Sequence, residues 1–115
     1  MTNICMERRW RSYRITMDGH AGFDMNGNDI VCHGISMLGF TLMQALIEAE
    51  ADGIIKHRSQ QIDDAHMEAV FTPVHRGKAD TIVNTILCGF KLLGNQYPNY
   101  CKVIEMVDLG GEIDI

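Results

Sequence analysis

Residues 10–49 read WRSYRITM DGHAGFDMNGN DIVCHGISMLGFTLMQALIEA, and this stretch decides the fold. Residues 10–17 fall into two alternating sets of side chains with β-branched and aromatic members, which predicts a strand. Residues 18–28 are rich in glycine and asparagine and must form a loop. From Ile30 to about Ala49, apolar residues recur every three or four positions, which predicts an amphipathic helix with one buried face. The predicted stripe consists of Val31, Ile35, Leu38, Leu42, Ala45 and Ala49.

Further elements are predicted on both sides of this stretch. Strands are expected over residues 3–7, Ile54–Ser59, His66–Thr72 and Cys101–Val107, and a second helix over about Ala79–Asn95. Gly53 is suited to end the first helix, and a polar turn at Gln61–Asp64 separates two of the strands. The predicted fold class is α+β: a two-layer α/β sandwich in which a small mixed sheet packs against two helices, in a single domain over residues 1–115.

Length and composition exclude several classes of protein. The chain has 115 residues, of which 46% are hydrophobic and 22% charged, as in an ordinary globular domain and unlike a disordered chain. No apolar run approaches the roughly 20 residues of a membrane span, and the first residues lack the apolar core of a signal peptide. We therefore expect a cytoplasmic protein without a membrane partner. Its four cysteines are then expected to be reduced thiols: Cys5, Cys32, Cys88 and Cys101. All but Cys32 are predicted to be core or strand residues.

The charge of the chain is unevenly distributed. The formal net charge is −5, yet residues 1–14 hold four arginines and one glutamate, a local charge of +3. Residues 15–115 therefore carry −8, because 6 basic residues face 14 acidic ones. Such an acidic surface repels nucleic-acid phosphates and favours a basic partner, so we expect no direct contact with nucleic acid. The arginine cluster is better explained as the solvated face of a strand than as an RNA contact.

A cysteine and a histidine flank the glycine-rich loop. Cys32 falls in the first turn of the predicted helix, where the positive end of the helix dipole favours a thiolate over a thiol. His20 lies at the end of the preceding strand, and a nearby imidazole can accept the thiol proton. Unpaired amides of the same helical turn can stabilise an oxyanion. The spacing is also compatible with a small buried cysteine and a turn histidine, so these residues alone do not establish catalysis.

The segment GHAGFDMNGNDIVCHGISML at residues 19–38 resembles the signature of the bacterial ribosomal-processing cysteine proteases, the Prp or YsxB-like family. Its matching features are Gly-His-Ala, a glycine-containing loop, Asp-Ile-Val-Cys and a serine four residues after the cysteine. The turn Tyr97-Pro98-Asn99-Tyr100 is a second match, and the resemblance extends from about Arg11 to Met106. It implies a homodimeric cysteine endopeptidase without a cofactor. Family members remove a short N-terminal extension from a ribosomal large-subunit protein or process phage structural proteins.

The resemblance also implies roles for individual residues. Cys32 matches the nucleophile of the family and His20 its general base. Asp29 and Ser36 match motif positions near the site, and Asp29 either caps the helix or orients His20. His33 departs from the family, which usually has a small residue after the nucleophile. It either points outward as a bystander or alters the pKa of the nucleophile or the substrate groove.

The loop between base and nucleophile is the predicted substrate loop. Gly22, Phe23 and Gly27 lie in it, and we expect it to close over the peptide as a lid, with a prebuilt rigid turn as the alternative. The methionines are expected mostly to fill the core, although an exposed subset would suit an apolar peptide groove.

The expected partner is a basic protein substrate with an N-terminal extension, from the ribosome or a phage. A zinc site is not expected, because the chain contains neither a CxxC nor an HxxxH pattern. The alternative to a protease is a binding module of the same fold that grips such a protein without cutting it.

Overall fold

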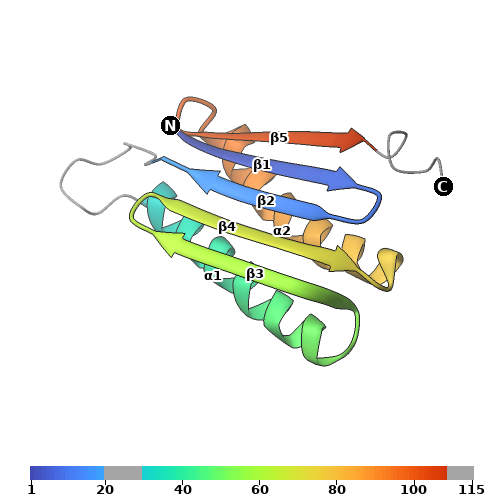
Figure 1. Ribbon diagram of the computed structural model, residues 1–115. Helices are drawn as coiled ribbons and strands as arrows, with labels where there is room; N and C mark the ends of the chain where they lie inside the picture. Colours follow the sequence, from blue (N-terminus) through green and yellow to red (C-terminus); the bar gives the residue numbers. More distant parts are fainter. Residues whose placement is uncertain (20–29, 109–115) are drawn as a thin grey trace.

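The computed structural model describes residues 1–19 and 30–108. The elements are β1 (Thr2–Arg9), β2 (Tyr13–Asp18), α1 (Ile30–Ala51), β3 (Ile55–Asp63), β4 (His66–Pro73), α2 (Arg76–Gln96) and β5 (Cys101–Asp108). The strands form one five-stranded sheet in the order β3-β4-β2-β1-β5. β1 and β5 are parallel and the other neighbours antiparallel. Both helices lie on the same face of the sheet (Figure 1), which confirms the predicted two-layer α+β fold.

Three element boundaries differ by three or more residues from the sequence-based prediction. β2 begins at Tyr13, because residues 10–12 form the turn from β1, in which the Arg9 amide donates to the Ser12 carbonyl at 2.9 Å. The predicted turn at Gln61–Asp64 begins too early: β3 continues to Asp63, and the turn to β4 consists of Asp64 and Ala65. β3 is an edge strand, so its polar side chains remain solvated within the strand. The second helix begins at Arg76, three residues earlier than predicted.

The hydrophobic core lies between the sheet and the two helices. Its largest fully buried side chains are Tyr13, Phe71 and Phe90. α1 contributes the buried residues Val31, Ile35, Gly39, Leu42, Met43, Leu46 and Ala49. Two members of the predicted stripe, Leu38 and Ala45, are only partly buried. The other four members of the predicted stripe are buried. The helix therefore turns the predicted face toward the core, with Leu38 and Ala45 at the border of that face.

A glycine sets how closely α1 approaches the sheet. A Cβ atom on Gly39 would lie 2.7 Å from Sδ of Met67 and 3.1 Å from Sδ of Met17. Both methionines stand on central strands, and larger side chains at this position of the helix would push it away from them. Gly39 therefore leaves room for the side chains of Met17 and Met67 beneath the first half of α1.

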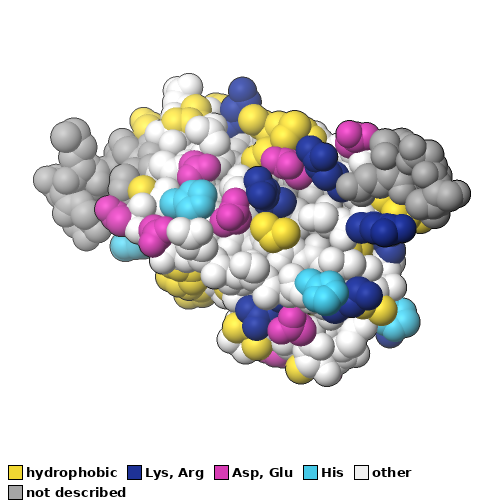
Figure 2. Space-filling model, in the orientation of Figure 1, with side chains coloured by type: hydrophobic (Ala, Val, Ile, Leu, Met, Phe, Trp, Pro, Cys, Tyr) yellow, Lys and Arg dark blue, Asp and Glu magenta, His cyan; other side chains and the backbone are white. Residues whose placement is uncertain are grey.

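The face of the sheet opposite the helices is exposed to solvent. Figure 2 shows this face, with Asp and Glu side chains concentrated toward the end where β3 turns into β4 and most Lys and Arg side chains toward the other end. In the cross-strand pairing, Asp18 lies opposite His66 and His66 opposite Asp63. The two ends of the sheet therefore differ in charge.

α1 is apolar on more than its buried face. It has 22 residues and a mean hydropathy of 1.7 over its most apolar window, long and apolar enough by these two measures to cross a membrane. The expectation that no segment approaches the length of a membrane span is therefore wrong by these measures. Core helices of soluble proteins have the same properties, and one face of α1 packs into the core of this fold. Its outer face nevertheless exposes four large apolar side chains: Ile30, Met37, Phe40 and Ile47. Met37 therefore belongs to the exposed subset of the methionines rather than to the core.

Candidate active site

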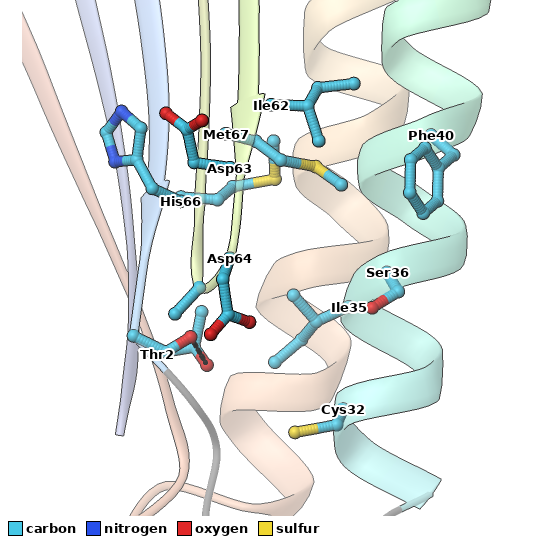
Figure 3. Close-up of a pocket in the computed structure, with 13 residues that line it drawn as sticks. Thr2, Cys32, Ile35, Ser36, Phe40, Ile62, Asp63, Asp64, His66 and Met67 are labelled. Carbon is cyan, nitrogen blue, oxygen red and sulfur yellow. Dashed lines mark hydrogen bonds between the residues drawn. The ribbon is translucent and has the colours of Figure 1, made fainter.

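Cys32 faces a cavity at the end of the sheet. It is the third residue of α1, is partly buried, and directs its Sγ atom into the cavity (Figure 3). The cavity has a volume of about 250 Å³ and lies between the first half of α1 and the hairpin formed by β3 and β4. Its lining residues are Thr2, Met17, Gly19, Cys32, Ile35, Ser36, Phe40, Ile62, Asp63, Asp64, Ala65, His66 and Met67. A thiol at a helix N-terminus thus faces a partly open cavity large enough for a substrate side chain.

The walls of the cavity are mostly apolar, with polar groups near the thiol. Met17, Ile62 and Met67 come from the sheet, and Ile35 comes from α1. Asp64, in the turn of the β3–β4 hairpin, directs its carboxylate into the same space as the Cys32 thiol (Figure 3). Such a site can hold an apolar side chain while polar groups at one end contact the peptide backbone.

The end of β2 is fixed next to this cavity. The Gly19 amide donates to the Ala65 carbonyl at 2.8 Å, and the Gly19 carbonyl accepts from the Thr2 hydroxyl at 3.2 Å. Gly19 has a φ of +99°, and a Cβ atom there would lie 2.5 Å from the carbonyl oxygen of Met1. Only glycine fits these two conditions without displacing the backbone. The chain therefore leaves the sheet toward His20 from a well-defined position.

The structure places three of the residues discussed from the sequence. Cys32 and Ser36 both line the cavity, with Ser36 one helical turn after the cysteine. His33 is exposed and is not part of the cavity lining, which is the geometry of the bystander interpretation. The other predicted site residues lie outside the described residues: His20, Gly22, Phe23, Gly27 and Asp29. The pairing of Cys32 with His20 and the lid therefore remain predictions.

Several cavity residues were not found by sequence reasoning. The sequence did contain a signal for Gly19, since it is the first residue of the Gly-His-Ala motif. No sequence signal pointed to Ile62, Asp64 and Met67. They lie about thirty residues after Cys32, in a segment without a recognisable motif. They reach the site only because β4 pairs with β2 in the sheet.

The remaining cysteines differ from Cys32 in their surroundings, and all four are free thiols. Cys101 is buried, and burial raises the pKa of its thiol. The pKa of the half-buried Cys5 thiol on β1 is also raised, mainly by burial and to a smaller extent by the charge of Glu7. Cys88 is exposed on α2, so the prediction that it is a core or strand residue is wrong. Within residues 1–19 and 30–108, no group of three or more His, Cys, Asp or Glu side chains is placed to hold a metal ion.

His66 borders the cavity but points away from Cys32. Its imidazole lies on the exposed face of the sheet (Figure 3), where Nδ1 contacts the carboxylate of Asp18. The hydrogen bond to Asp18 is the main cause that raises the pKa of His66 above its ordinary value of 6.5, and the charges of Asp18, Glu68 and Asp63 act in the same direction. His66 is thus a partner of Asp18 and is not positioned as a base for the thiol.

This contact predicts a pH dependence. We expect NMR titration of the His66 ring protons to give a midpoint above 6.5. Asp18→Asn should lower that midpoint more than Asp63→Asn, because Asp63 acts only through its charge. Since the folded-state pKa is raised, the contact stabilises the fold fully below the unfolded value of about 6.5 and loses this effect as the pH rises through the folded value. An unchanged midpoint in Asp18→Asn would contradict the assignment.

Comparison with known proteins relates this site to a family. The family model described as cysteine protease Prp matches residues 1–102. The essential ribosomal processing protease Prp from S. aureus, solved with a covalently linked product peptide, has a TM-score of 0.73 and 22% identity, covering 94% of this chain and 100% of that one. Its complex with a substrate peptide gives a TM-score of 0.66 and 21% identity over the same shares of the two chains.

A protein from Streptococcus mutans has a TM-score of 0.66 and 26% identity, covering 94% of this chain and 96% of its own. No curated protein matches the chain. At these identities the solved structures establish a shared fold, whereas the family model matches nearly the whole chain, including Cys32 and the other described residues of the cavity. The chain belongs to the family of the cysteine protease Prp.

Proposed function

We propose that this protein is a cysteine endopeptidase that removes a short N-terminal extension from a basic protein. Cys32 is the nucleophile and His20 the general base. The observation that carries the proposal is the position of Cys32, in the first turn of α1 and facing a cavity, in a chain of the cysteine protease Prp family. Asp29 and Ser36 act in support of these two residues.

The proposed reaction proceeds through an acyl-enzyme. His20 accepts the thiol proton of Cys32, and the thiolate attacks the scissile carbonyl carbon. Amides at the start of α1 stabilise the resulting oxyanion. The intermediate collapses, the C–N bond breaks, and His20 returns its proton to the leaving amine. Water, deprotonated by His20, then attacks the thioester carbon, which releases the new carboxylate and restores the thiol.

The substrate proposal rests on two observations. The S. aureus structures are those of a ribosomal processing protease with a substrate or product peptide, and they share the fold of this chain. The chain carries a net charge of −5, and acidic side chains concentrate at the cavity end of the exposed sheet face (Figure 2). Both favour a basic ribosomal or phage protein as substrate. We also propose that the enzyme is a homodimer and acts in the cytoplasm.

A direct test uses a recombinant ribosomal large-subunit protein that carries an N-terminal extension. Incubation with the purified enzyme should release the extension, and mass spectrometry of the shortened protein identifies the new N-terminus. A control substrate without the extension should remain uncut. A complex that forms and is stable, with no cleavage by the wild-type protein, would support the binding module instead.

Thiol reactivity provides an independent prediction. Near neutral pH, Cys32 should react with iodoacetamide at least about ten times faster than Cys88, because a helix N-terminus and an imidazole stabilise its thiolate. Cys88 is a demanding control, since it is the more exposed thiol of the two. Peptide mapping by mass spectrometry after short labelling times measures both rates. Equal rates would mean that Cys32 is not activated.

A further inference from the structure

Phe40 borders two neighbouring hollows on the same side of α1. It lines the cavity of Cys32, and it also lines a second hollow of about 420 Å³ along the helix. The second hollow is formed by Met37, Phe40, Thr41, Gln44, Ala45 and Glu48. In Figure 3, Phe40 on α1 and Ile62 on β3 lie at the end of the cavity away from Cys32. The second hollow is shallow and open, and Phe40 is the lining residue that it shares with the cavity of Cys32.

The side chains at this junction are large, apolar and exposed. Phe40 is 52% exposed, Met37 68% and Ile62 49%. A helix that packs on a sheet usually presents polar residues to water on its outer face, so this apolar group is not explained by the core. Covering such side chains with an apolar partner removes their surface from water and favours binding.

We propose that Phe40, Met37 and Ile62 form a subsite for a bulky apolar side chain of the peptide substrate, several residues from the scissile bond. The inference deepens the proposed function and rests on it. The occupant is the substrate because Phe40 and Ile62 also line the cavity that contains the nucleophile, and Met37 adjoins it through Phe40. An extended peptide whose scissile carbonyl lies at Cys32 passes Phe40 if it follows α1.

The geometry also gives the spacing. Phe40 is eight residues after Cys32 on the same helix. At about 1.5 Å per helical residue this is roughly 12 Å along the helix axis. An extended peptide advances about 3.3 Å per residue, so roughly three to four substrate residues separate the scissile bond from the side chain that reaches Phe40. Phe40 is thus a specificity-determining residue and takes no part in the chemical steps.

The test is a set of cleavable peptides in which leucine or alanine occupies each position within five residues of the scissile bond, one position at a time. For the wild-type enzyme we expect kcat/KM to favour leucine at a position three or four residues from that bond. Phe40→Ser should lower the ratio of kcat/KM for leucine over alanine at this position about tenfold or more, because serine offers no apolar surface to the leucine side chain of the substrate. Ile47→Ser is the matched control, since Ile47 is 41% exposed on α1 and lines neither hollow.

The possible results separate the subsite from its alternatives. An unchanged ratio in Phe40→Ser, or an equal loss in Phe40→Ser and Ile47→Ser, would overturn the proposal. A change in sedimentation from dimer to monomer in Phe40→Ser with the ratio preserved would assign the face to a second copy of the chain and also overturn it. If the wild-type protein cleaves no peptide, the proposed function fails, and calorimetric binding of the leucine and alanine peptides to Cys32→Ala still decides on the subsite.

Discussion

Cys32→Ala is expected to abolish peptide-bond cleavage while leaving the protein folded. Without the thiol no acyl-enzyme forms, and the remaining amides and binding contacts do not replace a nucleophile. Loss of the nucleophile in such an enzyme lowers kcat by about 10⁴-fold to 10⁶-fold. Cys32 is partly buried at the edge of the core, so removing its sulfur costs about 1 kcal/mol or less in the free energy of unfolding.

The measurement is the rate of release of the N-terminal extension, together with a thermal unfolding curve for each variant. Cys88→Ala is the matched control, because it removes another thiol from a helix without touching the cavity. It should cleave at the wild-type rate. If Cys32→Ala cleaves as fast as Cys88→Ala, the nucleophile has been assigned wrongly.

The fold could be predicted from the sequence where one face of an element is buried. The spacing of Val31, Ile35 and Leu42 located α1, because a helix on a sheet must bury one stripe. The same reasoning failed at the end of β3, where polar residues resemble a turn. An edge strand without burial on both faces has no such pattern, so its length is set by pairing with β4.

The candidate site could be predicted only in part, for a related reason. Cys32 and Ser36 belong to a local motif that the sequence displays directly. Asp64 and Ile62 complete the cavity from a hairpin whose position depends on the strand order β3-β4-β2. Strand order is a property of the folded sheet, and no short segment encodes it. Local patterns thus identified one wall of the cavity, and the opposite wall required the structure.

Gly19→Ala is expected to lower both stability and activity. A non-glycine residue at a φ of +99° is strained, and its Cβ would lie 2.5 Å from the Met1 carbonyl oxygen. Strain of this kind costs about 1–3 kcal/mol, which in a domain of this size lowers Tm by roughly 5–15 °C. Gly19 directly precedes the proposed base His20, so displacement of the backbone should also lower kcat, by about 10²-fold for a shift near 1 Å.

The Gly53→Ala variant separates the cost of the strained backbone from the cost of the clash between the new Cβ atom and Met1. Gly53 also has a positive φ, +74°, but a Cβ atom there would have no neighbour within 4 Å. Backbone strain alone should therefore lower the free energy of unfolding of this variant, by about 1 kcal/mol. The variant should cleave at the wild-type rate, because Gly53 lies beyond the end of α1 that is far from Cys32. Thermal unfolding and cleavage assays on both variants give the comparison. Equal losses of Tm would show that the Met1 carbonyl moves aside at little cost. A wild-type rate in Gly19→Ala would show that the contacts of Gly19 with Thr2 and Ala65 stabilise the sheet without positioning the base.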